Sequence, residues 1–266
     1  MPAPPDVPPH SSLSLDDAVD LTRTGDIWLF RGRTAADRAI QFTTNSPVNH
    51  VGMSVVLEDL PPLIWHAELG RSLPDRWSGT RHRGVQLHDL RDAVLVWTHR
   101  YGQRAWLRQL DGAVTRAMED AVLRTIARLD GTPFPSTAAL AGRWLRGRIP
   151  LPSRRGPRSR HQLAFGSRRS AGVHHPDDAV EEVADTTREH DGIEDPAADS
   201  AKERDSRLET AYCAEVVAVT YDAMGLLASG RPPAWYDPGR FWSGDELRLS
   251  VGARLGDEIE IEIPPK

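Results

Sequence analysis

Short apolar runs separated by turn-forming residues are the dominant pattern along the chain. Runs of about four to eight apolar residues between turn signals are typical of buried strands, so the pattern predicts a sheet. The expected strands cover residues 27–30, 50–57, 63–69, 84–90, 93–97, 253–255 and 259–263. Because only a short turn at Pro61 and Pro62 separates the second run from the third, we expect these two strands to be antiparallel neighbours.

Helical spacing of apolar residues occurs in other segments. The clearest case is 114–129, where apolar residues stand at positions 114, 118, 121, 122, 126 and 129. Ser14 is expected to cap a short helix over 15–21. Further helices are expected over 35–42, 138–145 and 213–225. Strands and helices together predict an α+β fold, in which an antiparallel sheet of about five or six strands packs against the helix that begins at Cys213.

Composition changes sharply between residues 150 and 208. This stretch is rich in Pro, Ser, Arg and acidic residues and has few large apolar side chains, so we expect a disordered insertion. A basic and then an acidic run in this region are typical of solvated chain, and an RNA-binding or partner-binding arm is the alternative. The expected organisation is an N-terminal arm with a short helix at 1–23, one domain in two parts at 24–149 and 209–266, and the insertion at 150–208.

The net charge of −5 over 266 residues gives no electrostatic reason to expect nucleic acid as a partner. A single cysteine cannot form an internal disulfide, and the proline-rich N-terminus lacks the basic and apolar regions of a secretory signal. No apolar run approaches the roughly 18 residues that a membrane span needs. We therefore expect a cytoplasmic protein without a transmembrane segment, and the sequence carries no signal for its oligomeric state.

Cys213 opens the apolar helix over 213–225. At the first turn of a helix, unsatisfied backbone N–H groups and the positive end of the helix dipole favour a thiolate. A cysteine in such a position is expected to be a reactive, partly exposed thiol with a depressed pKa. The alternative is a small hydrophobic core residue, which is the commoner role of a lone cysteine.

Two histidines begin or occupy short predicted strands. His50 opens the strand over 50–57 and His66 lies in the strand over 63–69. If these strands pair, one histidine can act as base toward Cys213 while the other orients it. The alternative is that both are structural histidines with satisfied hydrogen bonds.

These residues resemble a known family. Asn49-His50-Val51-Gly52-Met53 followed by Ile64-Trp65-His66-Ala67 is similar to the histidine strand and third-residue strand of the NlpC-type papain-like cysteine amidases and peptidases. The cysteine comes last, in Tyr212-Cys213-Ala214-Glu215-Val216-Val217, and the chain opens with Gly25-Asp26-Ile27-Trp28-Leu29. That order resembles the circularly permuted branch, which includes YiiX-like proteins and the lecithin:retinol acyltransferase group.

The resemblance implies a permuted papain-like fold with Cys213 as nucleophile, His50 as base and His66 as the orienting polar residue. Glu68 is the alternative third residue, because YiiX-like members often use glutamate and residues two apart in a strand share a face. His66 fits the motif register better. Tyr212 and the backbone N–H of Cys213 are candidates for an oxyanion hole, with packing as the alternative role of Tyr212.

The expected function is that of a cysteine hydrolase that cleaves an amide, ester or thioester through an acyl-enzyme. The expected partner is a small acyl substrate, a lipid or a peptide. An acyltransferase or lipid-modifying enzyme of the same fold, and an inactive binding module, are the alternatives. The mechanism needs no cofactor and no metal, and the His174-His175 pair lies in the expected insertion without companion ligands.

Overall fold

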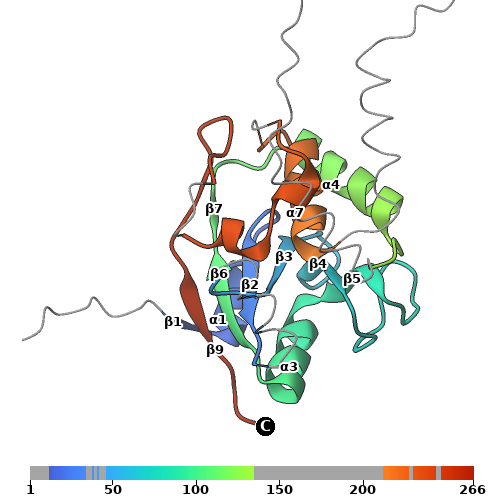
Figure 1. The fold of residues 1–266 in the computed structure, drawn as a ribbon, viewed down its shortest axis with the longest axis vertical. Coiled ribbons are helices and arrows are strands. Elements are labelled where there is room, and N and C mark those ends of the chain that lie inside the picture. Colours follow the sequence, from blue (N-terminus) through green and yellow to red (C-terminus); the bar gives the residue numbers. More distant parts are fainter. Residues whose placement is uncertain are drawn as a thin grey trace, which may run out of the picture. The chain divides into compact units, whose positions relative to one another are not determined.

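A seven-stranded sheet is the centre of the computed structural model (Figure 1). The structure describes residues 12–33, 38, 41, 46–134, 212–227, 230–243 and 247–266. They belong to one of two units of the chain, the one drawn from residues 1–149 and 205–266. The insertion expected at 150–208 and the helix expected at 138–145 lie outside the described residues, as does the helix expected at 35–42 apart from Arg38 and Gln41.

The strands of this sheet lie in the order β1-β9-β6-β2-β3-β4-β5. All neighbouring pairs are antiparallel except β1 and β9, which are parallel. The bounds are β1 Ser12–Ser14, β2 Ile27–Arg31, β3 His50–Val55, β4 Leu63–Glu68, β5 Gly84–Asp89, β6 Arg104–Arg108 and β9 Ile259–Glu262. A second, two-stranded sheet pairs β7 (Leu110–Asp111) with β8 (Arg254–Leu255).

Each face of the main sheet is covered by its own helices. On one face, α7 (Cys213–Ala223) lies across β3 and β4 with α4 (Arg116–Leu129) beside it (Figure 1). On the other face, α1 (Leu15–Leu21) and α3 (Leu90–Tyr101) pack against the strands. Two short 3-10 helices, η1 (Pro233–Trp235) and η2 (Pro238–Phe241), follow α7. No helix in the described part of the chain is long and apolar enough to cross a bilayer.

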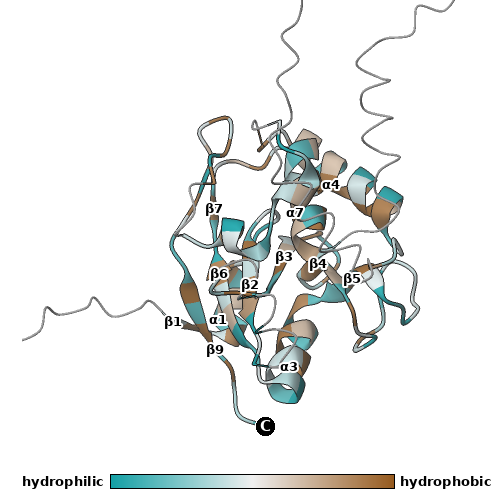
Figure 2. Ribbon diagram, viewed as in Figure 1, coloured by the Kyte–Doolittle hydropathy of each residue, from teal (hydrophilic) through white to brown (hydrophobic). Residues whose placement is uncertain are grey.

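Strand alternation divides the core into two clusters. Val51 and Met53 of β3 pack in the cluster on the α7 face, together with Trp65. Trp28 and Phe30 of β2 pack on the α3 face. Apolar residues colour β2 and β3 brown, whereas α4 carries both colours (Figure 2). The sheet is therefore buried on both faces. Each strand side chain points into one of the two hydrophobic clusters, according to the face on which it lies.

The strand expected at 93–97 is wrong, because this segment lies within the helix α3. Asp89 caps the helix by accepting a hydrogen bond from the backbone N–H of Asp92, and Gly102 ends it in the left-handed conformation. The buried residues recur with helical spacing at Leu90, Ala93, Val94 and Trp97. A short continuous apolar run does not distinguish a strand from a buried helix.

The mixed α+β class is confirmed, and so are the antiparallel pairing of β3 with β4 and the cap at Ser14. The expected sheet of five or six strands has seven in the described chain, because the pattern of apolar runs did not indicate β1 or β6. Of the two strands expected near the end of the chain, β9 joins the main sheet and β8 does not.

Replacing Gly52 by alanine is expected to cost about 1–3 kcal/mol of unfolding free energy, because overpacking a filled core forces its neighbours to move. A Cβ at Gly52 would lie 2.7 Å from two carbons of Ile64 and 3.3 Å from the Cβ of His66. Gly256→Ala is the matched control, since its Cβ would meet nothing closer than the Gln109 carbonyl at 3.6 Å. Urea denaturation measures both variants, and equal stabilities for them would contradict this reading of the β3–β4 contact.

Candidate functional site

Cys213 is the first residue of α7, as the sequence predicts. The preceding residue, Tyr212, is the N-cap, and its backbone N–H donates to Oε2 of Glu215 at 3.2 Å. This contact fixes the first turn of the helix around the thiol. Cys213 is only 2% exposed, so the expected partly exposed position is wrong.

The pKa of the Cys213 thiol is raised to about 12, chiefly because burial disfavours the thiolate. Backbone hydrogen bonds from Val51, Ala214 and Cys213 itself act in the opposite direction, and the nearby Glu215 charge adds to the increase. The helix start therefore favours the anion as expected, but desolvation outweighs it. The depressed pKa expected from the sequence is wrong for this state of the protein.

The strands β3 and β4 separate beside the thiol. Their register pairs Met53 with Trp65 and ends there, whereas β3 begins three residues earlier at His50. The first residues of β3 pair with β2 on the other side. The backbone of Val51 is thus available to the Cys213 sulfur on the side from which β4 has departed.

His50 and His66 come together on the α3 face of the sheet. Their rings are in edge-to-face contact with a centroid distance of 5.2 Å. The ring of Trp97 on α3 lies 5.1 Å from His50 and 4.8 Å from His66. Phe30 of β2 completes the aromatic surround of His50 at 5.7 Å.

The predicted pairing of the two histidine strands therefore holds, but the thiol lies in the other core cluster. Cys213 packs on the α7 face with Val51, while the two histidine rings pack with residues of the α3 face. Among the described residues no hydrogen bond joins Cys213 to a histidine, and Nε2 of His50 is buried without a partner. The roles expected for these three residues remain predictions.

His66 has a closer polar partner in His88 of β5. Nε2 of His66 lies 3.1 Å from Nδ1 of His88, and Nε2 of His88 lies 3.1 Å from Oε1 of Gln86. Burial lowers the pKa of His50 and of His88 to about 4 and that of His66 well below its ordinary value. All three imidazoles are consequently neutral at neutral pH.

Glu68 shares the face of His66, as strand alternation predicts. Its Oε2 lies 3.8 Å from Nδ1 of His88 and accepts a hydrogen bond from the Ser72 hydroxyl at 3.1 Å. Burial raises the pKa of this carboxyl, while hydrogen bonds from the Ser72 and Trp97 side chains lower it. Glu68 is therefore anchored by hydrogen bonds rather than simply solvated.

Tyr212 is held away from an oxyanion role by its own hydrogen bond. Its hydroxyl donates to the backbone carbonyl of Tyr236 at 3.3 Å. The side chain is buried, and this contact joins the start of α7 to the segment that follows it. The geometry favours the packing alternative for Tyr212.

His88, Gln86 and Trp97 are the members of this cluster that the sequence analysis did not single out. A signal for the first two exists, because Gln86 and His88 alternate with the apolar Val85 and Leu87 in a strand that is buried on both faces. Two polar side chains on one face of such a strand need partners there. Trp97 was missed because residues 93–97 were expected to form a strand and lie in the helix α3.

Two groups of side chains in the described structure have the ligand types and spacing for a metal ion. One is His66, Glu68 and His88, and the other is Asp75, His82 and Asp130. In the second group Asp75 is already satisfied, because it accepts hydrogen bonds from the backbone of Leu87 at 2.7 Å and of Ser78 at 2.6 Å. The His174-His175 pair lies outside the described residues.

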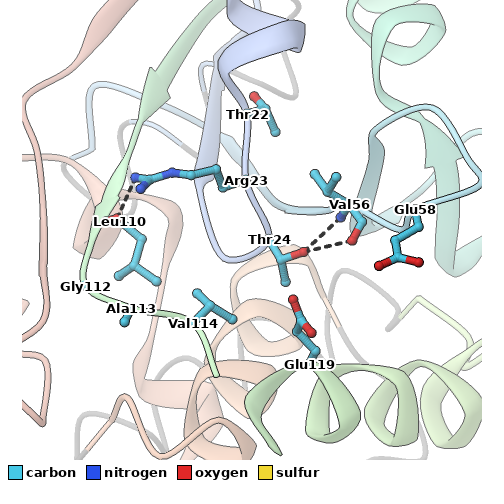
Figure 3. Close-up of a pocket in the computed structure, with 10 residues that line it drawn as sticks. All are labelled: Thr22, Arg23, Thr24, Val56, Glu58, Leu110, Gly112, Ala113, Val114 and Glu119. Atoms are coloured by element: carbon cyan, nitrogen blue, oxygen red, sulfur yellow. Dashed lines mark hydrogen bonds between the residues drawn. The ribbon is translucent and has the colours of Figure 1, made fainter. Parts of the chain in front are cut away.

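A surface cavity of about 440 Å³ lies elsewhere, between the loop after α1 and the start of α4 (Figure 3). Thr24 bonds the backbone of Val56 on one wall, and the carboxylates of Glu58 and Glu119 stand near it. None of its lining residues belongs to the histidine cluster or contacts the thiol. It contributes nothing to the chemistry of Cys213.

No protein-family model matches the chain, and no curated protein matches it. Among solved structures, the chain is similar to YiiX, a metalloprotein of Escherichia coli O157:H7 (DUF1105), with 23% sequence identity and a TM-score of 0.32. The match covers 43% of this chain and 53% of YiiX, so the chain spans about half of that protein. A similarity at this TM-score carries no information on the fold or the site.

Proposed function

We propose that the protein is a cysteine hydrolase with a permuted papain-like arrangement, in which Cys213 attacks an acyl carbonyl. The observation that carries the proposal is the setting of the sulfur at the first residue of α7, where backbone groups of Val51, Ala214 and Cys213 favour its anion. Val51 directly follows His50 in β3. Nucleophile and candidate base thus come from adjoining points of the helix and the sheet.

His50 is the proposed base. Because its ring packs on the α3 face and Cys213 on the α7 face, the proposal requires a change of backbone conformation at the start of β3. Aromatic contacts hold the ring where it is, and its buried Nε2 has no hydrogen bond within the described structure to keep it there. An unpartnered buried nitrogen costs free energy, so a conformation in which this nitrogen bonds the thiol would regain a hydrogen bond. The pKa of His50, lowered to about 4 by burial, leaves the ring neutral at neutral pH.

The proposed reaction conserves every proton. The Cys213 S–H proton passes to His50 as the sulfur bonds to the acyl carbon, and His50 then protonates the leaving amine, alcohol or thiol. Water, deprotonated by His50, releases the acid from the thioester and restores the thiol. An acyl acceptor in place of water would make the same site an acyltransferase. Small amides, esters and thioesters are the proposed substrate class.

His66 remains the proposed orienting residue in preference to Glu68. The rings of His50 and His66 are in direct contact, whereas the carboxylate of Glu68 is engaged by Ser72 and Trp97. A residue that orients the base must touch it. His66 meets that condition in the present structure.

Cys213→Ala is expected to abolish turnover of a panel of acyl amides, esters and thioesters, and His50→Ala to lower kcat/KM about 10²- to 10⁴-fold, the usual contribution of a general base. His99→Gln is the matched control, because His99 lies on α3 and bonds the Pro264 carbonyl, away from the thiol. Mass spectrometry of the trapped acyl-enzyme locates the adduct. Turnover that persists in Cys213→Ala would rule out the thiol mechanism, whereas wild type without turnover or adduct would favour a binding module.

A further inference from the structure

We propose that His66, Glu68 and His88 form a binding site for a divalent transition metal ion, with zinc as the best match. Nε2 of His66, Nδ1 of His88 and a carboxylate oxygen of Glu68 lie within 4.8 Å of one another. The three residues come from two neighbouring strands, β4 and β5, on the α3 face. The site shares His66 with the thiol chemistry proposed above but does not include Cys213.

The spacing of the three donor atoms fits one ion. Zinc bonds to imidazole nitrogen and carboxylate oxygen are about 2.0–2.2 Å long, so two ligands of a tetrahedral ion are about 3.4 Å apart. The two nitrogens are 3.1 Å apart, and Oε2 of Glu68 is 3.8 Å from Nδ1 of His88. Shifts of a few tenths of an ångström, with the His66 proton on Nδ1 in place of Nε2, convert these contacts into ligand bonds.

Outer hydrogen bonds already orient two of the three ligands. Because Oε1 of Gln86 only accepts, Nε2 of His88 is the donor, and the lone pair of Nδ1 points toward His66 and Glu68. The Ser72 hydroxyl and the Trp97 side chain hold the Glu68 carboxylate. Such outer partners fix the tautomer and direction of metal ligands in known sites.

The charge of the cluster calls for a cation. Glu68 brings a negative charge into the same buried region, and its only ion-pair partner within the described structure is the neutral His88. Two neutral imidazoles and one carboxylate form the ligand set of many catalytic zinc sites, which keep a fourth position open.

The ion can reach the site past Glu68. The two histidines are fully buried, while the Glu68 side chain is 12% exposed. Gly70 lets the loop after β4 lie against this carboxylate, because a Cβ there would fall 2.3 Å from Oε1. The Glu68 side chain is therefore the part of the site that faces solvent.

The test uses the full chain, stripped with a chelator and titrated with Zn²⁺ by calorimetry and with Co²⁺ by visible absorption. We expect one ion per chain, a tetrahedral Co²⁺ spectrum, and a higher melting temperature with Zn²⁺. His88→Gln and Glu68→Gln are each expected to weaken binding at least 100-fold, and Gln86→Ala about 10- to 100-fold, as for other outer partners. Asp130→Asn, in the Asp75, His82 and Asp130 group, is the matched control and should bind as wild type.

Two results would overturn the site. Wild type that binds no Zn²⁺ would refute it directly, and loss of binding in Asp130→Asn with retention in His88→Gln and Glu68→Gln would move the ion to the other group. Circular dichroism establishes that each variant is folded, and Glu68→Gln, at the exposed side, replaces His88→Gln if that variant unfolds. Cys213→Ala should keep full Zn²⁺ affinity, so failure of the metal site can be told apart from failure of the thiol mechanism.

Discussion

Lowering the pH from 7.5 to 5 is expected to reduce the unfolding free energy. The protonation of His50 and of His88 in the unfolded chain each accounts for about 2 kcal/mol of this reduction. In the folded protein burial lowers the pKa of both side chains from 6.5 to about 4, and it lowers that of His66 in the same direction. A loss of this size is a large part of the roughly 5–15 kcal/mol that stabilises a domain. The effect arises from neutral histidines packed in a core.

The sign follows from proton counts in the two states. Between pH 6.5 and 4 the unfolded chain binds a proton at each histidine and the folded protein does not, so the unfolded state is stabilised relative to the folded state as pH falls. Asp130 acts in the opposite direction, because burial and Asp75 raise its pKa to about 6. As pH falls, Asp130 binds a proton in the folded protein before it does so in the unfolded chain. This protonation adds about 1 kcal/mol to the unfolding free energy at pH 5.

A comparison of variants isolates the histidine share. Urea unfolding of wild type and His88→Gln is measured at pH 7.5, 6 and 5, with a chelator present to keep metal out of the balance. The difference in stability between the two proteins should shrink by about 2 kcal/mol toward pH 5, because only wild type has His88 to protonate on unfolding. His99→Gln is the control for the exchange of a histidine for glutamine outside the buried cluster. Parallel curves for His88→Gln would show that His88 is protonated in the fold.

The strands that carry His50 and His66 were predictable because turn-forming residues bound each apolar run. The start of α7 at Cys213 was predictable for the same kind of reason, since an apolar run of helical length follows it. Local signals of this type act over a few residues and need no knowledge of the fold. They also place His66 and Glu68 on one face of a strand.

What the sequence did not contain was the set of neighbours in space. The pKa of Cys213 depends on what covers the first turn of α7, and burial there outweighs the helix start that the sequence displays. His88 lies 22 residues from His66 in sequence and 3.1 Å from it in space, through the register of β4 with β5. The separation of thiol and imidazoles between two core clusters likewise follows from which helix covers which face.

Arg108 of β6 links the sheet to the C-terminal segment. It is 6% exposed and donates to the backbone carbonyls of Gly256 at 2.6 Å, Phe241 at 2.7 Å and Leu255 at 3.2 Å. Glu258 stands 3.6 Å from Nε as the compensating charge. One guanidinium thus donates to three carbonyls that lie outside the main sheet.

Replacing Arg108 by methionine is expected to cost about 3–5 kcal/mol, because the change leaves Glu258 and the three carbonyls without their partner. Arg104→Met is the matched control on the same strand. Arg104 pairs with Glu260 at the surface, and an exposed pair of this kind contributes at most about 1 kcal/mol. Urea unfolding of both variants measures the contrast.

The same substitution is expected to expose the thiol. Phe241, whose carbonyl Arg108 holds, packs its ring 6.2 Å from that of Tyr221 on α7 and 6.3 Å from that of Tyr236, whose carbonyl accepts the Tyr212 hydroxyl. Release of the Phe241 backbone therefore loosens the segment that packs along α7 and the start of that helix. Cys213 should react with a disulfide reagent faster in folded Arg108→Met than in wild type or Arg104→Met. Equal rates in all three proteins would show that the burial of the thiol does not depend on this segment.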